Sequence, residues 1–91
     1  MYAGFTAAGT AHGGHESTLL ALYNTVHHFG GSLVTPGYTH PVKFEDGNPY
    51  GASLVTGDDD ESFDGAGRSA VEHLVERVVD VSGRLLRGTT D

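Results

Sequence analysis

The sequence predicts an α/β fold with a mainly parallel sheet. Short β-type segments alternate with long segments whose apolar residues recur every three or four positions, and glycine and proline separate them. Strands that alternate with helices are typical of β-α-β units, in which helices cover a parallel sheet. We therefore expect strand, loop, helix, strand, long loop and helix, in one partial domain over residues 1–91 without an internal repeat.

The first strand is predicted over residues 2–6, where aromatic residues flank small ones. A loop follows over residues 7–14, and His12 is the only large side chain in it. Small residues let the backbone turn sharply, so this loop is expected to be tight.

The first helix is predicted from Glu16 to the glycine pair at 30–31. The carboxylate in its first turn and the adjacent His27 and His28 in its last turn match the helix dipole. The two glycines end the helix, as glycine commonly does just beyond a C-terminus. The expected buried face consists of Leu19, Leu22, Tyr23, Val26 and Phe29.

Two further short strands are predicted after this helix. Residues 32–35 form the second strand, which a Pro-Gly pair closes, and residues 52–56 are a possible third. Between them, residues 38–51 are rich in proline and glycine and predict a long connection built of turns. Residues 57–61 predict a solvated acidic turn.

The last helix is predicted to begin near Ser62 or Asp64, either of which can cap it. Its expected buried face consists of Val71, Leu74, Val75, Val78, Val81 and Leu85. A parallel sheet is normally covered by helices on both faces, and two strands with two helices are not expected to supply both covers. The chain therefore reads as half of a doubly wound domain.

Composition narrows the function classes. A chain of 91 residues has room for one small domain, which excludes a large self-contained enzyme. The absence of cysteine excludes a disulfide scaffold, thiolate zinc sites and a cysteine nucleophile. A net charge of −7 does not suit a phosphate backbone, so we expect no nucleic-acid partner. No apolar run is long enough for a membrane span, and we expect a cytoplasmic protein.

Three metal or nucleotide motifs are incomplete. His15 and Glu16 begin like H-E-x-x-H, but Leu19 stands where the second histidine is needed. The acidic run at 58–60 lacks the glycine and the glutamate of a calcium loop. Residues 65–70 match G-x-G-x-x-A, but an acidic loop precedes them where the dinucleotide motif has a strand.

Six histidines leave a small histidine-metal protein open as a minor alternative. His12 and His15 have H-x-x-H spacing, His27 and His28 are adjacent, and imidazole suits zinc, copper or nickel. Adjacent residues on a helix point about 100° apart, so the pair at 27–28 cannot readily share one ion. Polar histidines at helix ends and in loops are the plainer interpretation.

The segment from Thr6 to Gly14 is the most informative one for function. It lies between the end of a strand and the start of a helix, where open α/β sheets bind ligands. Glycine and alanine let the backbone approach a flat ligand, and N–H groups at a helix start favour negative charge. A flavin fits such a site, because its pyrimidine edge is rich in acceptors and its reduced ring carries negative charge. An ordinary tight loop beside a core helix is the competing interpretation.

Three blocks carry a family resemblance. F-T-A-A-G-T-A-H-G-G-H-E-S-T-L-L at 5–20 resembles the F-T-S-S-G-T-x-H-G-G-Q-E-T-T-L-L stretch of flavodoxin-like NAD(P)H:quinone oxidoreductases of the tryptophan-repressor-binding-protein type. T-V-H-H-F-G at 25–30 is similar to T-L-L-H-x-G in that family, and G-N-P-Y-G-A-S at 47–53 is similar to G-x-P-Y-G-A-T. The blocks keep their order and spacing. The resemblance covers residues 1–57 well and the last helix loosely.

This resemblance implies an FMN protein that takes a hydride from NAD(P)H and passes two electrons to a quinone, within a homo-tetramer. It implies that the loop wraps the isoalloxazine through backbone contacts and that a histidine lies beside the flavin. The implied cofactor-binding residues are Thr6, Ala7, Ala8, Gly9, Thr10, His12, Gly13, Gly14 and His28. No side chain is nominated as acid, base or nucleophile. The sequence departs from the family at Ala7 and Ala8, which replace serines, at His15, which replaces glutamine, and at Gly31, which replaces an apolar residue.

The resemblance covers only the C-terminal part of the family's domain. In the family the FMN phosphate is held by the loop after the first strand, and we expect that N-terminal half to be absent from residues 1–91. The chain is thus expected to be the C-terminal part of an FMN-dependent quinone oxidoreductase. The alternative is a non-catalytic binding or assembly module that no longer holds flavin. In both cases we expect marginal stability or oligomerisation, because a sheet edge or face would be exposed.

Overall fold

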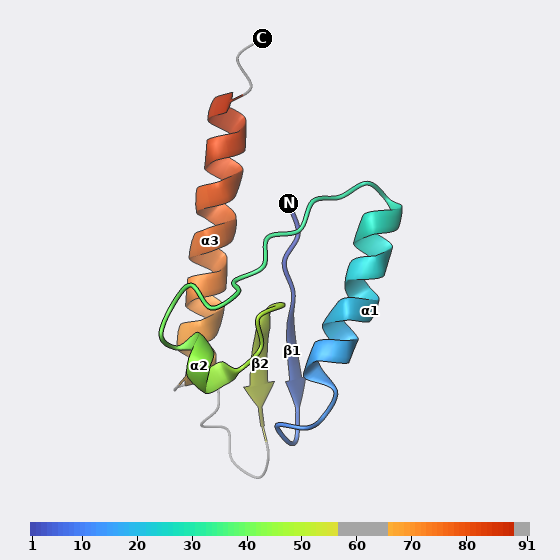
Figure 1. Ribbon diagram of the computed structural model, residues 1–91, viewed down its shortest axis with the longest axis vertical. Helices are drawn as coiled ribbons and strands as arrows, with labels where there is room; N and C mark the ends of the chain where they lie inside the picture. Colours follow the sequence, from blue (N-terminus) through green and yellow to red (C-terminus); the bar gives the residue numbers. More distant parts are fainter. Residues whose placement is uncertain (57–65, 89–91) are drawn as a thin grey trace.

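The computed structural model describes residues 1–56 and 66–88 (Figure 1). The elements in chain order are β1 (Phe5–Ala8), α1 (His15–His28), α2 (Lys43–Asp46), β2 (Ala52–Val55) and α3 (Ala66–Gly88). β1 and β2 pair in parallel, with Phe5 opposite Ala52 and Ala8 opposite Val55. The predicted α/β fold with a parallel sheet is confirmed, in a form compatible with part of a flavodoxin-like domain.

β1 begins and ends later than the predicted residues 2–6. The Thr56 N–H donates to Ala8 O over 2.9 Å, so the ladder continues to Ala8. Alanine has a low strand propensity, and here the pairing with β2, which is distant in sequence, overrides it. The loop after β1 is therefore shorter and comprises residues 9–14, and the third predicted strand, residues 52–56, is confirmed as β2.

The prediction of a second strand over residues 32–35 was wrong, because this segment forms only a single bridge. Tyr2 pairs with Leu33 through two backbone hydrogen bonds of 2.9 and 2.8 Å to the residues on either side of it. Pro36 has no backbone N–H to continue a ladder. Gly37 has a φ of +55°, so the chain turns away at this point.

α1 closes one face of the sheet, above Gly4 and Gly51. Leu19 and Tyr23 are the apolar side chains of α1 that are buried there. A Cβ at Gly4 would lie 2.7 Å from Leu19 Cδ2, and a Cβ at Gly51 would lie 2.2 Å from Gly4 O. Glycine at both positions therefore permits this close approach. The Tyr23 hydroxyl donates to Tyr50 O, and burial raises the pKa of that hydroxyl.

The first predicted helix is confirmed, with its start at His15 in place of Glu16. Its expected apolar face is only partly buried, since Val26 is half-buried while Leu22 and Phe29 are exposed. The sheet in the described residues has two strands, and of the apolar residues expected on this face it buries only Leu19 and Tyr23.

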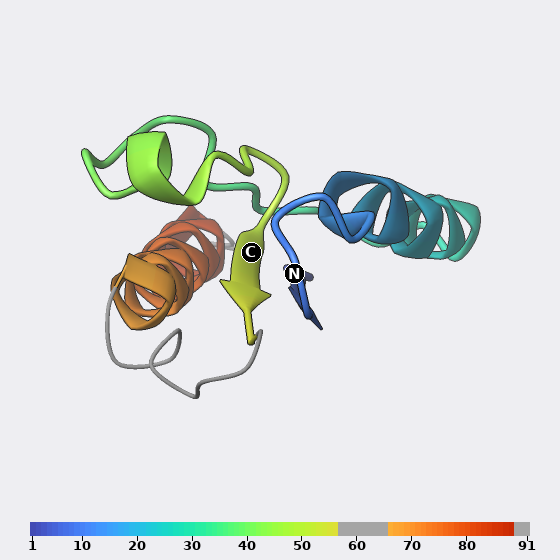
Figure 2. The ribbon, with the colours of Figure 1, turned by 90° about the horizontal axis from the view of Figure 1, so that it is seen from below.

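α3 packs on the opposite face of the sheet from α1 (Figure 2), so each face has one helix, which the sequence did not lead us to expect. The core on that side consists of Val42, Ala52, Ala70 and Leu74, with Val71 packed against it. The predicted apolar face of α3 continues past this core, but Val75 and Leu85 are exposed. Val71, Val78 and Val81 are half-buried, so this face is only partly covered.

The predicted long connection contains a short helix, α2, that its turn-rich composition does not indicate. Lys43 is fully buried, and its Nζ donates to Asp46 Oδ2 and, over 2.7 Å, to Gly51 O. Asp46 Oδ1 accepts from the Ser53 N–H over 2.9 Å, and the fully buried Asn48 donates to Ser53 Oγ over 2.9 Å. Charged residues are rarely buried unless they are paired. This polar cluster fixes the connection against β2.

A second polar contact holds the connection on α3. The Thr39 hydroxyl donates to Pro36 O over 2.6 Å, so its oxygen accepts from His73 Nε2 over 2.7 Å. The rings of His40 and His73 lie 5.0 Å apart. Burial lowers the pKa of His73, and electrostatic interactions with His40 and Arg77 lower it further.

Several predictions concern residues outside the described ranges. These are the acidic turn at 57–61, the helix caps Ser62 and Asp64, and Gly65 of the G-x-G-x-x-A match. Within residues 1–56 and 66–88, no helix is long and apolar enough to cross a membrane.

Candidate functional site

The predicted binding loop lies where β1 ends and α1 begins, and two of its glycines are required by its shape. Gly13 donates its N–H to Thr10 O over 3.2 Å, which closes a tight turn. A Cβ at Gly13 would lie 2.6 Å from the Ala8 Cβ. Gly14, the N-cap residue of α1, has a φ of +78°, which favours glycine. The small residues that predict this loop thus serve its backbone geometry.

His15, the first residue of α1, holds this loop in place. Its side chain is buried, its Nδ1 lies 2.7 Å from Thr6 Oγ1, and its Nε2 lies 3.0 Å from Thr10 O. A carbonyl oxygen can only accept, so Nε2 carries the proton, and in the neutral ring Nδ1 accepts from the Thr6 hydroxyl. One imidazole therefore links Thr6 in β1 to Thr10 in the middle of the loop. The sequence pattern presents His15 only as a metal candidate and as a departure from the family.

The start of α1 leaves positive partial charge beside the loop. Gly14 has no side chain to cap the helix, and the first bond of the helix is Thr18 N–H to Gly14 O, 2.9 Å long. The backbone N–H groups before Thr18 have no partner inside the helix. Together with the helix dipole, they favour an electron-rich ligand edge at this end of α1.

Most of the predicted site residues gather at this end of the molecule, with two exceptions. Thr6 and Ala8 face α1, whereas Ala7 alternates to the other face of the sheet and is exposed. His28 lies at the far end of α1, where its ring meets Phe29 edge-on at 5.3 Å. At 1.5 Å per residue, the helix separates it from Gly14 by about 20 Å. The loop and His28 of one chain therefore cannot contact the same flavin ring.

The histidine-metal alternative finds no set of ligands in the described part of the chain. Both ring nitrogens of His15 are engaged in the loop contacts, and His12 is exposed on the loop. His27 and His28 lie at the opposite end of α1. In residues 1–56 and 66–88 no three histidine, aspartate or glutamate side chains group as metal ligands would.

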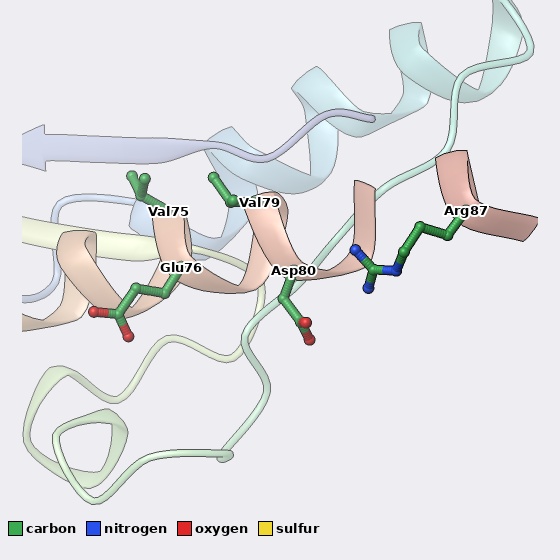
Figure 3. A pocket seen from close by; sticks show the side chains of 5 residues that line it. All are labelled: Val75, Glu76, Val79, Asp80 and Arg87. Carbon is green, nitrogen blue, oxygen red and sulfur yellow. The ribbon is translucent and has the colours of Figure 1, made fainter. Parts of the chain in front are cut away.

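A hollow on α3 lies far from the loop in the sequence. It is lined by Val75, Glu76, Val79, Asp80 and Arg87 (Figure 3). All five come from one helix, and none is among the predicted binding residues. The hollow therefore adds nothing to the candidate site.

Curated proteins named NAD(P)H dehydrogenase (quinone) are similar to this chain. The protein from Deinococcus radiodurans is 41% identical over 86 residues, which cover 93% of this chain and 42% of the relative. The protein from a Bradyrhizobium strain is 32% identical over 89 residues, which cover 92% of this chain and 45% of the relative. The protein from Methanosarcina acetivorans is 42% identical over 60 residues, which cover 60% of this chain and 29% of the relative.

No protein-family model matches the chain. The chain spans less than half the length of the curated relatives named above.

Proposed function

Because this chain is homologous to part of the proteins named NAD(P)H dehydrogenase (quinone), we propose that it supplies the flavin-ring segment of an FMN-dependent quinone oxidoreductase. NAD(P)H is the proposed electron donor and a quinone the acceptor, in a two-electron reduction. The observation that carries the proposal is the glycine-rich loop at the end of β1, which His15 holds beside the uncapped start of α1. When bound, FMN would supply the hydride chemistry, and the protein would supply position and charge.

The residues present fit the ring of a flavin. Gly9 leaves open space where a Cβ would stand, so the main chain can approach a flat ring at this point. The N–H groups at the start of α1 would face its acceptor-rich edge and stabilise negative charge there. Thr6 and His15 would act indirectly, because their contacts fix the shape of the loop. His12 is exposed at the rim, where it could contact bound ligand.

His28 enters this proposal only through oligomerisation. It lies about 20 Å along α1 from the loop, so it would contribute to a flavin held by another copy of the chain. A homo-tetramer, as the family resemblance implies, would allow such sharing. We also retain a cytoplasmic location as part of the proposal.

The alternative function is a non-catalytic binding or assembly module. The observation that favours it is the exposed apolar surface formed by Phe5 of β1 and Val79 of α3, which a binding partner would cover. A chain without the remaining part of the family's domain would hold at most the ring of the cofactor.

A titration with two flavins tests the proposal. FMN and lumiflavin, which has the ring without the ribityl phosphate, are added to the protein, and quenching of flavin fluorescence is measured. Because the loop is proposed to hold the ring, both flavins should bind in the micromolar range with similar affinity. Replacing His15 by leucine should weaken both by about tenfold or more, a loss of about 1.4 kcal/mol.

The matched variant is His15→Gln, because an amide can donate to Thr10 O and accept from the Thr6 hydroxyl as the imidazole does. It should retain most of the affinity. Absence of saturable binding of either flavin by the folded protein would contradict the proposal and leave the assembly module. Equal binding by His15→Leu and the unmodified chain would contradict the role of His15.

A further inference from the structure

The C-terminal half of α3 extends beyond the sheet. Figure 1 shows the helix continuing well past the ends of β1 and β2. Leu86 in this half is 76% exposed, and Val79 near the middle of the helix is 66% exposed. Single exposed apolar residues are normal on a protein surface, whereas a group of them marks a contact site. This part of α3 is therefore a candidate interaction surface.

The exposed apolar residues of α3 form a stripe, which we call the α3 stripe. It consists of Val75, Val79, Ser82 and Leu86, and successive members are four, three and four positions apart. This spacing places residues on one side of a helix and is the spacing with which one helix packs on another. Figure 3 shows Val75 and Val79 pointing to the same side of α3. The stripe therefore favours a helix as its occupant.

The spacing of the stripe is the same when it is read in either direction. In an antiparallel pair of α3 helices, Val75 would lie opposite Leu86 of the second copy, and Val79 would lie opposite Ser82 of the second copy. In a two-fold interface each contact occurs twice, because the same surface is used on both copies. The stripe is thus complementary to itself.

The charged residues beside the stripe distinguish the two possible directions. Glu76, Asp80, Gly83 and Arg87 each follow a stripe residue by one position. The Arg87 side chain runs back along the helix, and its Nη1 lies 3.1 Å from where a Cβ at Gly83 would stand (Figure 3). In an antiparallel pair this guanidinium would face Glu76 of the second copy. A parallel pair would instead place like charges opposite each other, which is unfavourable.

The same alignment also covers an apolar groove between α3 and β1. Val75 and Val79 line this groove together with Phe5, which is 61% exposed. Leu86 of the second copy, opposite Val75, would enter the groove and cover Phe5. One occupant therefore accounts for the stripe, the charges beside it and the groove.

We propose that α3 binds a second copy of this chain, with the two α3 helices antiparallel and in contact through the α3 stripe. The apolar contacts are Val75 with Leu86 and Val79 with Ser82, and the ionic contact is Glu76 with Arg87. The interface involves neither the candidate flavin loop nor His28, so it does not depend on the proposed function.

This association should be weak, because about three turns of each helix take part. We expect a dissociation constant of about 10–100 µM. Unfolding measured at about 1 µM therefore reports the single chain, since a dimer is stabilised only by mass action.

Sedimentation equilibrium tests the proposal by measuring this dissociation constant. Val79→Lys should raise it by about tenfold or more, because the apolar contact would have to bury a charge. The control is Leu22→Lys on α1, where leucine is 51% exposed on the other face of the sheet, and it should change the constant by less than about twofold. A chain that stays monomeric at about 500 µM, or equal changes in the two variants, would overturn the proposal.

An exchange of charges tests the antiparallel direction. Glu76→Arg should raise the dissociation constant by about fivefold, because it would meet the like charge of Arg87 in the second copy. Adding Arg87→Glu restores opposite charges and should bring the constant back to within about twofold of that of the unmodified chain. Glu16→Arg on α1 makes the same change in net charge and should have little effect. No recovery in the combined variant, or equal weakening by Glu16→Arg, would contradict the ionic contact.

Cysteine cross-linking locates the contact, because the chain has no cysteine of its own. A chain with Val75→Cys is mixed with a chain with Leu86→Cys, and the mixture is oxidised. A disulfide requires Cα atoms within about 7 Å, so the antiparallel pair predicts links mainly between the two different variants. Links mainly between two copies of the Val75→Cys chain would show a parallel pair and overturn the proposal.

Discussion

The two faces of the sheet are packed to different degrees. On the α1 face, glycines at 4 and 51 let Leu19 and Tyr23 approach the backbone closely, and a Cβ has no room. On the α3 face, Leu74 is buried, but Phe5 and Val79 are exposed. The closed face carries the candidate flavin loop. The difference teaches that, among residues 1–56 and 66–88, the face that carries the loop is closely packed, whereas the opposite face is only partly covered.

The largest loss of stability should come from breaking the ion pair between Lys43 and Asp46, which holds the connection against β2. Lys43→Met leaves Asp46 buried without its cation, which should lower the free energy of unfolding by about 3–5 kcal/mol. Urea unfolding followed by circular dichroism measures the loss. The control is Arg84→Met, whose exposed pair with Asp80 should contribute less than about 1 kcal/mol. Equal effects of the two variants would show that β2 does not depend on the buried pair.

The buried and the exposed parts of the α3 face can be compared by truncating one side chain in each part of the same helix. Leu74→Ala should cost about 2–5 kcal/mol, because it leaves a cavity under α3. Val79→Ala should cost less than about 0.5 kcal/mol, because that side chain is largely exposed and makes few contacts to lose. Thermal unfolding of both variants gives the comparison. A large loss of stability in Val79→Ala would mean that this side chain is already covered in solution.

The closed face should resist even one added methyl group. Gly4→Ala places a Cβ 2.7 Å from Leu19 Cδ2, and such overpacking should cost about 1–3 kcal/mol. Gly9→Ala is the matched control, because a Cβ at Gly9 would meet nothing within 4 Å. The midpoints of urea unfolding decide between them, and similar midpoints would contradict the close packing of α1 on β1.

The smallest effect should be the pH dependence of the contact between α3 and the connection. The pKa of His73 is lowered in the folded protein, so the neutral form favours folding. Its contribution is fully present above the unfolded value of 6.5 and is lost as the pH falls through that value towards the folded pKa. The groups that act on His73 are His40, Arg77, Glu76 and Lys43.

His73→Gln should reduce the slope of stability against pH as the pH falls below the unfolded value of 6.5, because an amide can donate to Thr39 without titrating. His27→Gln on α1 is the control. Urea unfolding at several pH values measures both slopes. If His73→Gln and the unmodified chain keep the same slope, the pH dependence arises elsewhere.

Much of this fold follows from local sequence, and the differences have physical causes. The periodicity of α1 and the glycines after β1 predict a helix and a tight loop, because both depend on neighbouring residues. Burial of Lys43 and Asn48 could not be predicted, because their partners Gly51 O and Ser53 become neighbours only after the connection folds back. How much of the apolar face of each helix is buried likewise depends on how many strands lie beneath it.

The candidate site was predicted unevenly for similar reasons. The loop residues were brought together as expected, since they are contiguous and a strand and a helix fix their ends. His28 was grouped with them by family resemblance, although the helical rise already separates it from the loop. The two hydrogen bonds of His15 could not be predicted from the sequence. Nothing in the residues beside it indicates that Thr6 and Thr10 lie on either side of its ring in the folded chain.

The bridge between Tyr2 and Leu33 also has a kinetic consequence. It lies on the same edge of β1 as β2, since Tyr2 and Gly4 direct their backbone groups to the same side. Pairing β1 with β2 directly requires closure of a long loop, which slows folding. Once the bridge has formed, only the connection between Leu33 and Ala52 has to close. The Tyr2–Leu33 bridge can thus divide one slow loop closure, that between β1 and β2, into two shorter and faster closures.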